Sequence, residues 1–126
     1  MTRFTPSDLD LARAADELLI DAGKRLAGVV GVAASGLASP YPDSHPTEIL
    51  AALQRWLGRQ ARIRECENEI LALLLMRGAS RRGLADAIGV RPETISTRVG
   101  GHRAATATRA DIARDTAGRW QWADPG

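Results

Sequence analysis

Cysteine, aromatic residues and long hydrophobic runs are all scarce in this sequence of 126 residues. The single cysteine, Cys66, has no second cysteine for a disulfide, which is typical of a reducing compartment. The few aromatic residues, and the predominance of Ala, Leu, Ile and Val among the apolar ones, favour helices over a large β-sheet. The longest apolar run, Ile70–Met76, is far too short to cross a bilayer, and no signal-peptide pattern is present. We therefore expect a cytoplasmic protein that binds no membrane.

Sequence signatures of catalysis, cofactor binding and metal binding are also missing. The chain has no Gly-rich phosphate loop, no nucleophile elbow and no paired acid and base at a spacing typical of catalysis. His45 and His102 lie far apart in the sequence, and neither belongs to a cluster of Cys or His residues. We therefore expect neither an enzyme nor a cofactor or metal site.

Lysine is almost absent, and the positive charge is unevenly distributed. Sixteen of the seventeen cations are arginine, a bias that GC-rich codons of a bacterial genome explain. Residues 1–52 carry four cations and seven anions, whereas residues 77–119 carry nine arginines and four acidic residues. A basic C-terminal half is typical of a protein that binds nucleic acid through that half.

Two long helical stretches are expected before residue 78. The first begins after a cap at Ser7 and runs to about residue 34, and the Pro-rich segment 35–46 follows as a loop. The second begins after Asp43 or Ser44, runs from about 46 to 77, and contains Gly58 as a possible interruption. One apolar seam has residues seven apart, which is typical of helix pairing: Ile49, Trp56, Ile63 and Ile70. These helices carry more apolar surface than one small domain covers, so we expect a homodimer formed through them.

Residues 80–99 are the most informative stretch. Leu84 and Ile88 are four residues apart, so a helix here places both on one buried face. Gly89 follows at the position where a helix needs a left-handed residue to end. Pro92 suits the first turn of a second helix, because the N–H that it lacks has no partner there. The stretch therefore predicts two short helices joined by a tight turn.

The second helix is expected to run over about residues 92–103, with Ile95 and Val99 facing the core. The pattern changes after residue 110. There, residues 111–114 and 119–122 flank a four-residue turn and predict a β-hairpin, with Trp120 and Trp122 packing beneath it.

The pattern of a small residue (Ala85), a turn glycine (Gly89), two inward-facing pairs and a following hairpin resembles the winged helix-turn-helix DNA-binding transcriptional regulators of bacteria. The resemblance covers about residues 65–123 and leaves the N-terminal 45 residues without a family. It implies a mainly α fold: a winged helix-turn-helix domain over 65–126 with a C-terminal hairpin as the wing. Long N-terminal helices over 1–64 precede this domain and serve as a dimerisation or interaction arm.

The resemblance also implies that the helix over about 92–103 is the recognition helix, which enters the major groove of double-stranded DNA. Its outward and flanking side chains are expected to contact base edges or phosphates, arginines at the helix starts to contact phosphates, and arginines beside the hairpin turn to reach the minor groove. The candidate DNA-contacting residues are Arg81, Arg82, Arg91, Glu93, Thr94, Ser96, Thr97, Arg98, Arg103, Arg114 and Arg119. A buried Thr97 would contradict this prediction.

We therefore expect a sequence-specific transcriptional regulator that binds duplex DNA as a homodimer in the nucleoid. One alternative keeps DNA binding but assigns it to a plasmid-partition, phage or nucleoid-associated factor. Another makes the acidic N-terminal helices a docking module for a sigma factor or other protein. The sequence identifies neither the target site nor a small-molecule effector.

Overall fold

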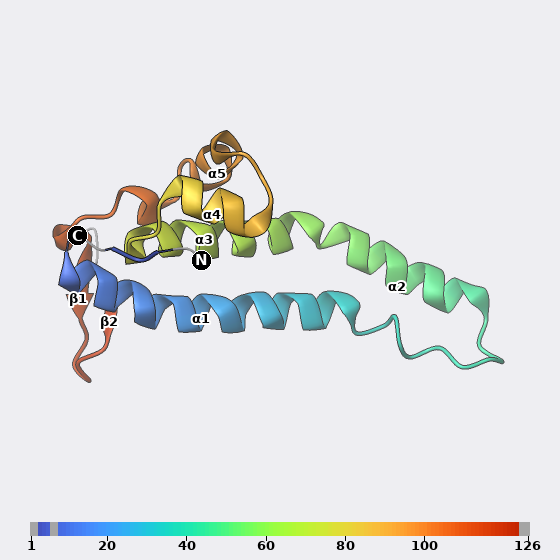
Figure 1. Ribbon diagram of the computed structural model, residues 1–126. Helices are drawn as coiled ribbons and strands as arrows, with labels where there is room; N and C mark the ends of the chain where they lie inside the picture. Colours follow the sequence, from blue (N-terminus) through green and yellow to red (C-terminus); the bar gives the residue numbers. More distant parts are fainter. Residues whose placement is uncertain (1–2, 6–7, 124–126) are drawn as a thin grey trace.

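The computed structural model describes residues 3–5 and 8–123, which form a mainly helical molecule with one small antiparallel hairpin. The elements in chain order are α1 (Leu9–Ala34), α2 (Pro46–Gly58), α3 (Gln60–Arg77), α4 (Arg81–Ile88), α5 (Pro92–Val99), the 3-10 segments η1 (Arg103–Thr106) and η2 (Arg109–Asp111), β1 (Ile112–Arg114) and β2 (Trp120–Trp122). Figure 1 shows α1 lying along α3 at the centre of an elongated molecule. The pair α4–α5 covers the side of α3 away from α1, and α2 extends beyond them as an arm.

Helix α1 ends where the sequence predicts, but its expected cap is wrong. The expected cap, Ser7, lies outside the described residues, and the helix is capped by Asp8. Its carboxylate accepts the backbone N–H groups of Asp10 at 2.9 Å and Leu11 at 3.1 Å. An aspartate at this position satisfies N–H groups that no helical carbonyl reaches, and its charge suits the positive end of the helix.

The predicted helix over 46–77 is divided into two. Helix α2 ends at Gly58 and α3 begins at Gln60, with Arg59 between them at φ −100° and ψ 0°. The cap of α2 is His45, whose Nδ1 accepts the N–H of Thr47 at 3.2 Å, in place of the expected Asp43 or Ser44. The expected division of the chain between residues 64 and 65 falls inside α3.

The main core lies between α1, α3, α4 and α5. It is built from small residues of α1 such as Ala22, the apolar end of α3 around Leu73, and the inward residues Leu84, Ile95 and Val99. Ile95 and Val99 are 0% and 1% exposed, as their spacing predicts. Ile88 is 45% exposed, so its predicted burial beside Leu84 is wrong. It occupies the final turn of α4, beyond the part of the helix that lies on the core.

Helix α5 is shorter than predicted. It ends at Val99, because Gly100 leaves the helical conformation at φ −56° and ψ 128°, and Gly101 adopts φ +85°. His102 then caps η1 by accepting the N–H of Ala104 on Nδ1 at 3.1 Å. Arg103 therefore belongs to η1 and not to α5.

The C-terminal hairpin forms as predicted, with Ile112 paired to Trp122 and Arg114 to Trp120. The Asp115 carboxylate holds the turn by accepting the N–H groups of Ala117 and Arg119, both at 2.9 Å. Trp120 is 7% exposed and packs in a second core cluster with Ala14 of α1, as expected of a tryptophan beneath the hairpin. The Glu17 carboxylate of α1 also accepts the backbone N–H of Trp120. The hairpin is thus attached to the N-terminal part of α1.

Candidate nucleic-acid interface

Helices α4 and α5 meet at a tight turn whose geometry depends on Gly89. This residue ends α4 in the left-handed conformation, at φ 76° and ψ 35°, which L side chains adopt only at a cost. The next N–H, that of Val90, returns to the carbonyl of Ala85 at 2.9 Å. Ser80 caps α4 by accepting the N–H of Gly83 at 2.9 Å. The turn sets α5 against the core by Ile95 and Val99 and leaves its opposite face outward.

The outward face of α5 is polar and open to solvent. Glu93, Ser96 and Thr97 are exposed, and Thr94 is half-buried beside the core. The Thr97 hydroxyl donates to the carbonyl of Glu93 at 3.0 Å, which leaves its oxygen lone pairs free to accept. Thr97 is therefore not covered by any other described part of the fold.

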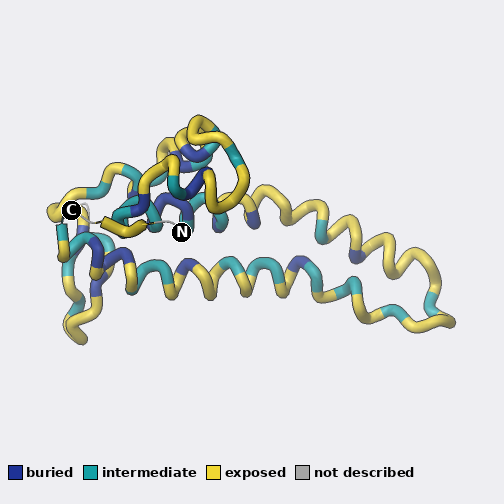
Figure 2. The backbone as a smooth tube through the Cα atoms, viewed as in Figure 1, coloured by how far each residue is buried: buried dark blue, intermediate teal, exposed yellow. Residues whose placement is uncertain are grey.

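Three of the predicted phosphate contacts, Arg81, Arg82 and Arg91, are exposed at the starts of α4 and α5. The ion pairs in the described ranges involve other arginines. No carboxylate there therefore balances the charge of these three. Figure 2 shows the outer side of α4 and α5 as largely exposed. The α4–α5 unit, residues 81–99, thus presents positive charge beside a polar helix face.

Arg98 lies apart from this exposed group. Its Nε donates to the Asn68 side-chain oxygen at 2.8 Å, and its Nη2 lies 3.1 Å from the Glu67 carboxylate. Its side chain is 17% exposed. Because Arg98 is three residues beyond Ile95, it lies on the flank of α5 that faces α3. It joins the two helices and does not point outward with Thr97.

The structure does not bring the remaining predicted residues to the face of α5. The guanidinium of Arg103 lies over Trp122, 4.3 Å from the ring centroid, and that of Arg114 lies 4.6 Å from the centroid of Trp120. Arg119 lies 3.8 Å from the Asp21 carboxylate of α1. In Figure 1 the hairpin crosses α1 on the side away from α5. Arg114 and Arg119 therefore belong to a different surface from the α4–α5 unit.

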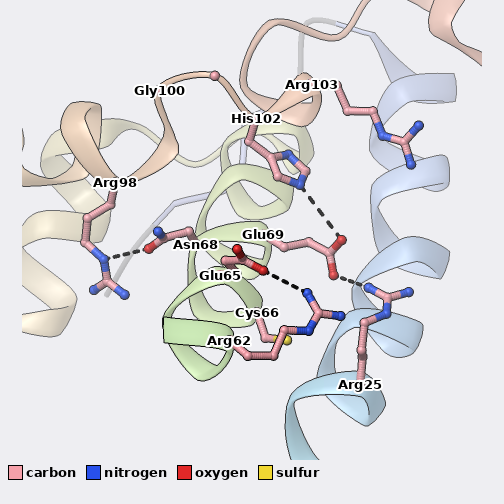
Figure 3. A pocket seen from close by; sticks show the side chains of 11 residues that line it. Arg25, Arg62, Glu65, Cys66, Asn68, Glu69, Arg98, Gly100, His102 and Arg103 are labelled. Carbon is pink, nitrogen blue, oxygen red and sulfur yellow. Dashed lines mark hydrogen bonds and ion pairs between the residues drawn. The ribbon is translucent and has the colours of Figure 1, made fainter. Parts of the chain in front are cut away.

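A hollow beneath the end of α5 was not anticipated from the sequence. Its volume is about 500 Å³, and its walls come from α1, α3, Arg98 of α5 and the segment that follows α5 (Figure 3). Two ion pairs lie in its wall: Glu69 of α3 with Arg25 of α1, and Arg62 with Glu65 within α3, the latter at 3.1 Å. The sequence offered no signal for this site, because its residues come from α1, α3, α5 and the segment 100–103 and follow no known motif.

His102 stands in the wall of this hollow. Burial lowers the pKa of its imidazole below the ordinary value, and the nearby Arg103 acts in the same direction, while Glu69 opposes the shift. Nε2 of His102 lies 3.8 Å from the Glu69 carboxylate. Since Nδ1 accepts the N–H of Ala104, the neutral ring carries its proton on Nε2 and directs it toward Glu69.

Comparison with family models, with curated proteins and with solved structures finds no match to this chain. Within residues 3–5 and 8–123, no helix combines the length and apolarity needed to cross a membrane. The same ranges contain no group of three or more His, Cys, Asp or Glu side chains placed to hold a metal ion. The geometry described above therefore carries the functional argument alone.

Proposed function

We propose that this chain is a helix-turn-helix DNA-binding transcriptional regulator that acts on duplex DNA as a homodimer. The observation that carries the proposal is the exposed polar face of α5 next to three arginines without carboxylate partners, Arg81, Arg82 and Arg91. A rigid helix of this polarity fits the major groove, and free guanidinium groups beside it attract phosphates.

The two sets of side chains have different roles in this proposal. Arg81, Arg82 and Arg91 bind phosphates and fix the position of the unit on the duplex. Glu93 accepts from cytosine N4 groups, and the hydroxyls of Ser96 and Thr97 bond to base edges. Sequence preference therefore resides in α5 and affinity mainly in the arginines.

The length of α5 favours a dimer. Its eight residues span about 12 Å, which corresponds to roughly three or four base pairs. So short a contact discriminates few sequences. Two copies with their α5 helices about 34–36 Å apart read two half-sites on successive turns of DNA.

The arm provides the surface for pairing two copies. Helix α2 has one buried residue, Ala52, and an exposed apolar stripe. The stripe consists of residues 42–59% exposed: Ile49, Leu50, Leu53 and Leu57. The expected seam of apolar residues seven apart does not stay exposed beyond α2, because Ile63 of α3 is 7% exposed and already packed. We infer that the α2 stripe packs against its counterpart in a second copy, because its exposure to water is costly.

The hairpin has no DNA contact in this proposal. A wing contacts the duplex beside the recognition helix, whereas β1 and β2 lie against α1, away from α5. Their tryptophans extend the core between the ends of α1 and α3, with Met76 and Leu11 packed against them.

The salt dependence of DNA binding tests the proposal. Fluorescence anisotropy with the duplex immediately upstream of the chain's own gene is expected to show a steep fall in affinity with salt, with a slope of about −0.9 per phosphate contact. Arg82→Ala with Arg91→Ala is expected to make that slope shallower by roughly two units. A matched pair away from the α4–α5 unit, Arg13→Ala on α1 with Arg55→Ala on α2, is expected to leave it unchanged. Affinity that does not depend on salt contradicts DNA binding.

The α2 stripe also suits a partner protein, which is the one observation that favours a docking module. The same two substitutions distinguish the two functions. A docking module retains its binding to the partner protein after Arg82→Ala and Arg91→Ala, whereas a DNA-binding regulator loses its affinity for the duplex. A footprint that spreads beyond one operator indicates a partition or nucleoid-associated factor instead.

A further inference from the structure

A second hollow lies between α1 and the junction of α2 with α3, and we name it the α1–α3 groove. Its volume is about 440 Å³, a size typical of small-molecule sites. Its lining consists of Arg25, Gly28, Val29, Val32, Arg59 and Arg62. Three of these residues carry positive charge, none carries negative charge, and the rest are apolar.

Two of the three arginines of the groove are shared with the hollow beneath α5. Arg25 and Arg62 line both this groove and the hollow beneath α5, so the two cavities adjoin at these side chains. Figure 3 shows both guanidinium groups extending from α1 and α3 into the same region. Arg59 is exposed at the junction of α2 and α3 and has no carboxylate partner among the described residues.

The apolar part of the groove is open because of a glycine. A Cβ built on Gly28 meets no atom within 4 Å, so the space beside α1 is vacant at this position. Val29 is half-buried, and Val32 is 61% exposed. An apolar chain lying along Gly28 and Val32 would remove this surface from water.

We propose that the α1–α3 groove binds an organic carboxylate with an apolar tail. Arg25, Arg59 and Arg62 hold the carboxylate, and the tail lies along Gly28, Val29 and Val32. Guanidinium groups bind carboxylates through paired hydrogen bonds. No acidic residue lines the groove, but Arg25 bonds to Glu69 and Arg62 to Glu65 beside it, so a ligand carboxylate binds Arg59 directly and competes with these two glutamates for the other arginines. This site goes beyond the proposed DNA binding and does not depend on it.

One consequence does rest on DNA binding. The Glu69 carboxylate bonds to Arg25 and also lies beside His102, which follows α5 by three residues. A ligand carboxylate competes with Glu69 for Arg25. Occupancy of the groove is therefore expected to shift residues 100–103 and to change the DNA affinity of α5.

The test measures binding without DNA. Octanoate is titrated into the full chain labelled with ¹⁵N, beside acetate, which lacks the tail, and octylammonium, which reverses the charge. Octanoate is expected to shift the amide signals of Gly28, Val32 and Arg62 in a saturable way, whereas acetate and octylammonium do not. The absence of saturable shifts, or equal shifts with octylammonium, overturns the proposal.

Two pairs of variants locate the site. Gly28→Leu fills the groove and is expected to weaken octanoate binding at least tenfold, whereas Gly23→Leu, on the same helix and also without neighbours within 4 Å, leaves it unchanged. Arg59→Gln is expected to weaken binding several-fold, and the exposed Arg13→Gln is its control. Equal binding by Gly28→Leu and wild type contradicts the site. Octanoate binding without any change in DNA affinity supports the site and removes only its link to α5.

Discussion

At the scale of single residues, arginines that look alike in the sequence differ in the contacts that they make in the structure. Arg91 is exposed and without a carboxylate partner, whereas Arg98, seven residues later, bonds to Asn68 and Glu67 of α3. The sequence predicts Arg91 just before the helix over about 92–103 and Arg98 within it, and spacing alone gives Arg98 a flank position. Which flank meets α3 depends on the packing angle of α5, which periodicity does not specify.

The pair Arg91→Ala and Arg98→Ala separates DNA binding from stability. Arg98→Ala is expected to lower the free energy of unfolding by about 1–3 kcal/mol, because it removes two hydrogen bonds made by a charged, largely buried group. Arg91→Ala is expected to leave stability unchanged and to weaken DNA binding. Urea denaturation and anisotropy measured on both variants check this. Loss of DNA affinity in a fully stable Arg98→Ala variant contradicts the assignment.

His102 makes the stability of the folded chain depend on pH. Because burial lowers the pKa of His102 in the folded state, the unfolded chain binds this proton more readily. Its contribution to stability is thus complete above about pH 6.5, the ordinary value, and declines as pH falls below it toward the lowered pKa. His102→Asn keeps a capping acceptor for Ala104 and removes the titration. Thermal unfolding at pH 7.5 and 5.5 is expected to show a larger decrease for wild type than for the variant, and equal decreases would contradict this role.

At the scale of elements, the sequence predicts the existence of helices better than their ends. The end of α1 and the loop after it follow from three prolines, which no regular element accommodates. The break at Arg59 and the end of α5 at Val99 each lie next to glycine, yet glycine alone does not decide whether a helix stops. Gly23 and Gly28 remain inside α1. Contacts outside each segment determine the difference.

Gly89 and Gly23 form a matched pair of glycine substitutions. Neither position has an atom within 4 Å of a built Cβ, so conformation alone distinguishes them. Gly89→Ala is expected to lower stability by about 1–2 kcal/mol, because φ is +76° there. Gly23→Ala is expected to raise stability by about 1 kcal/mol, because it replaces glycine inside a helix. Calorimetric melting of both variants measures the signs, and a stabilising Gly89→Ala variant would be inconsistent with the turn.

At the scale of the whole molecule, the mainly helical fold with a C-terminal hairpin is confirmed, while the place of the hairpin is not available from the sequence. Alternation of Ile112 with the tryptophans indicates a strand pair with one buried face. It does not indicate that this face lies on α1, where Ala14 packs against Trp120 and Glu17 binds its N–H. The two cavities cannot be predicted from the sequence for the same reason, because each combines residues more than thirty positions apart.

The oligomeric state is expected to depend on the α2 stripe. Leu53→Glu with Leu57→Glu places charges on the exposed apolar face without disturbing the buried Ala52. The wild type is expected to elute as a dimer and this variant as a folded monomer in size-exclusion chromatography with light scattering. Gln54→Glu adds charge at another exposed position of the same helix and is the control. A wild-type monomer at high concentration would exclude this mode of pairing.

The junction at Arg59 has a mechanical consequence if two copies join through their arms. Helix α2 projects about 20 Å from this point, given 13 residues at 1.5 Å each. A pivot of only ~10° there displaces the tip by roughly 3.5 Å, close to the 3.4 Å rise of one base pair. Under the proposed DNA binding by a homodimer, the angle between α2 and α3 at Arg59 therefore sets the half-site spacing that the two copies can span.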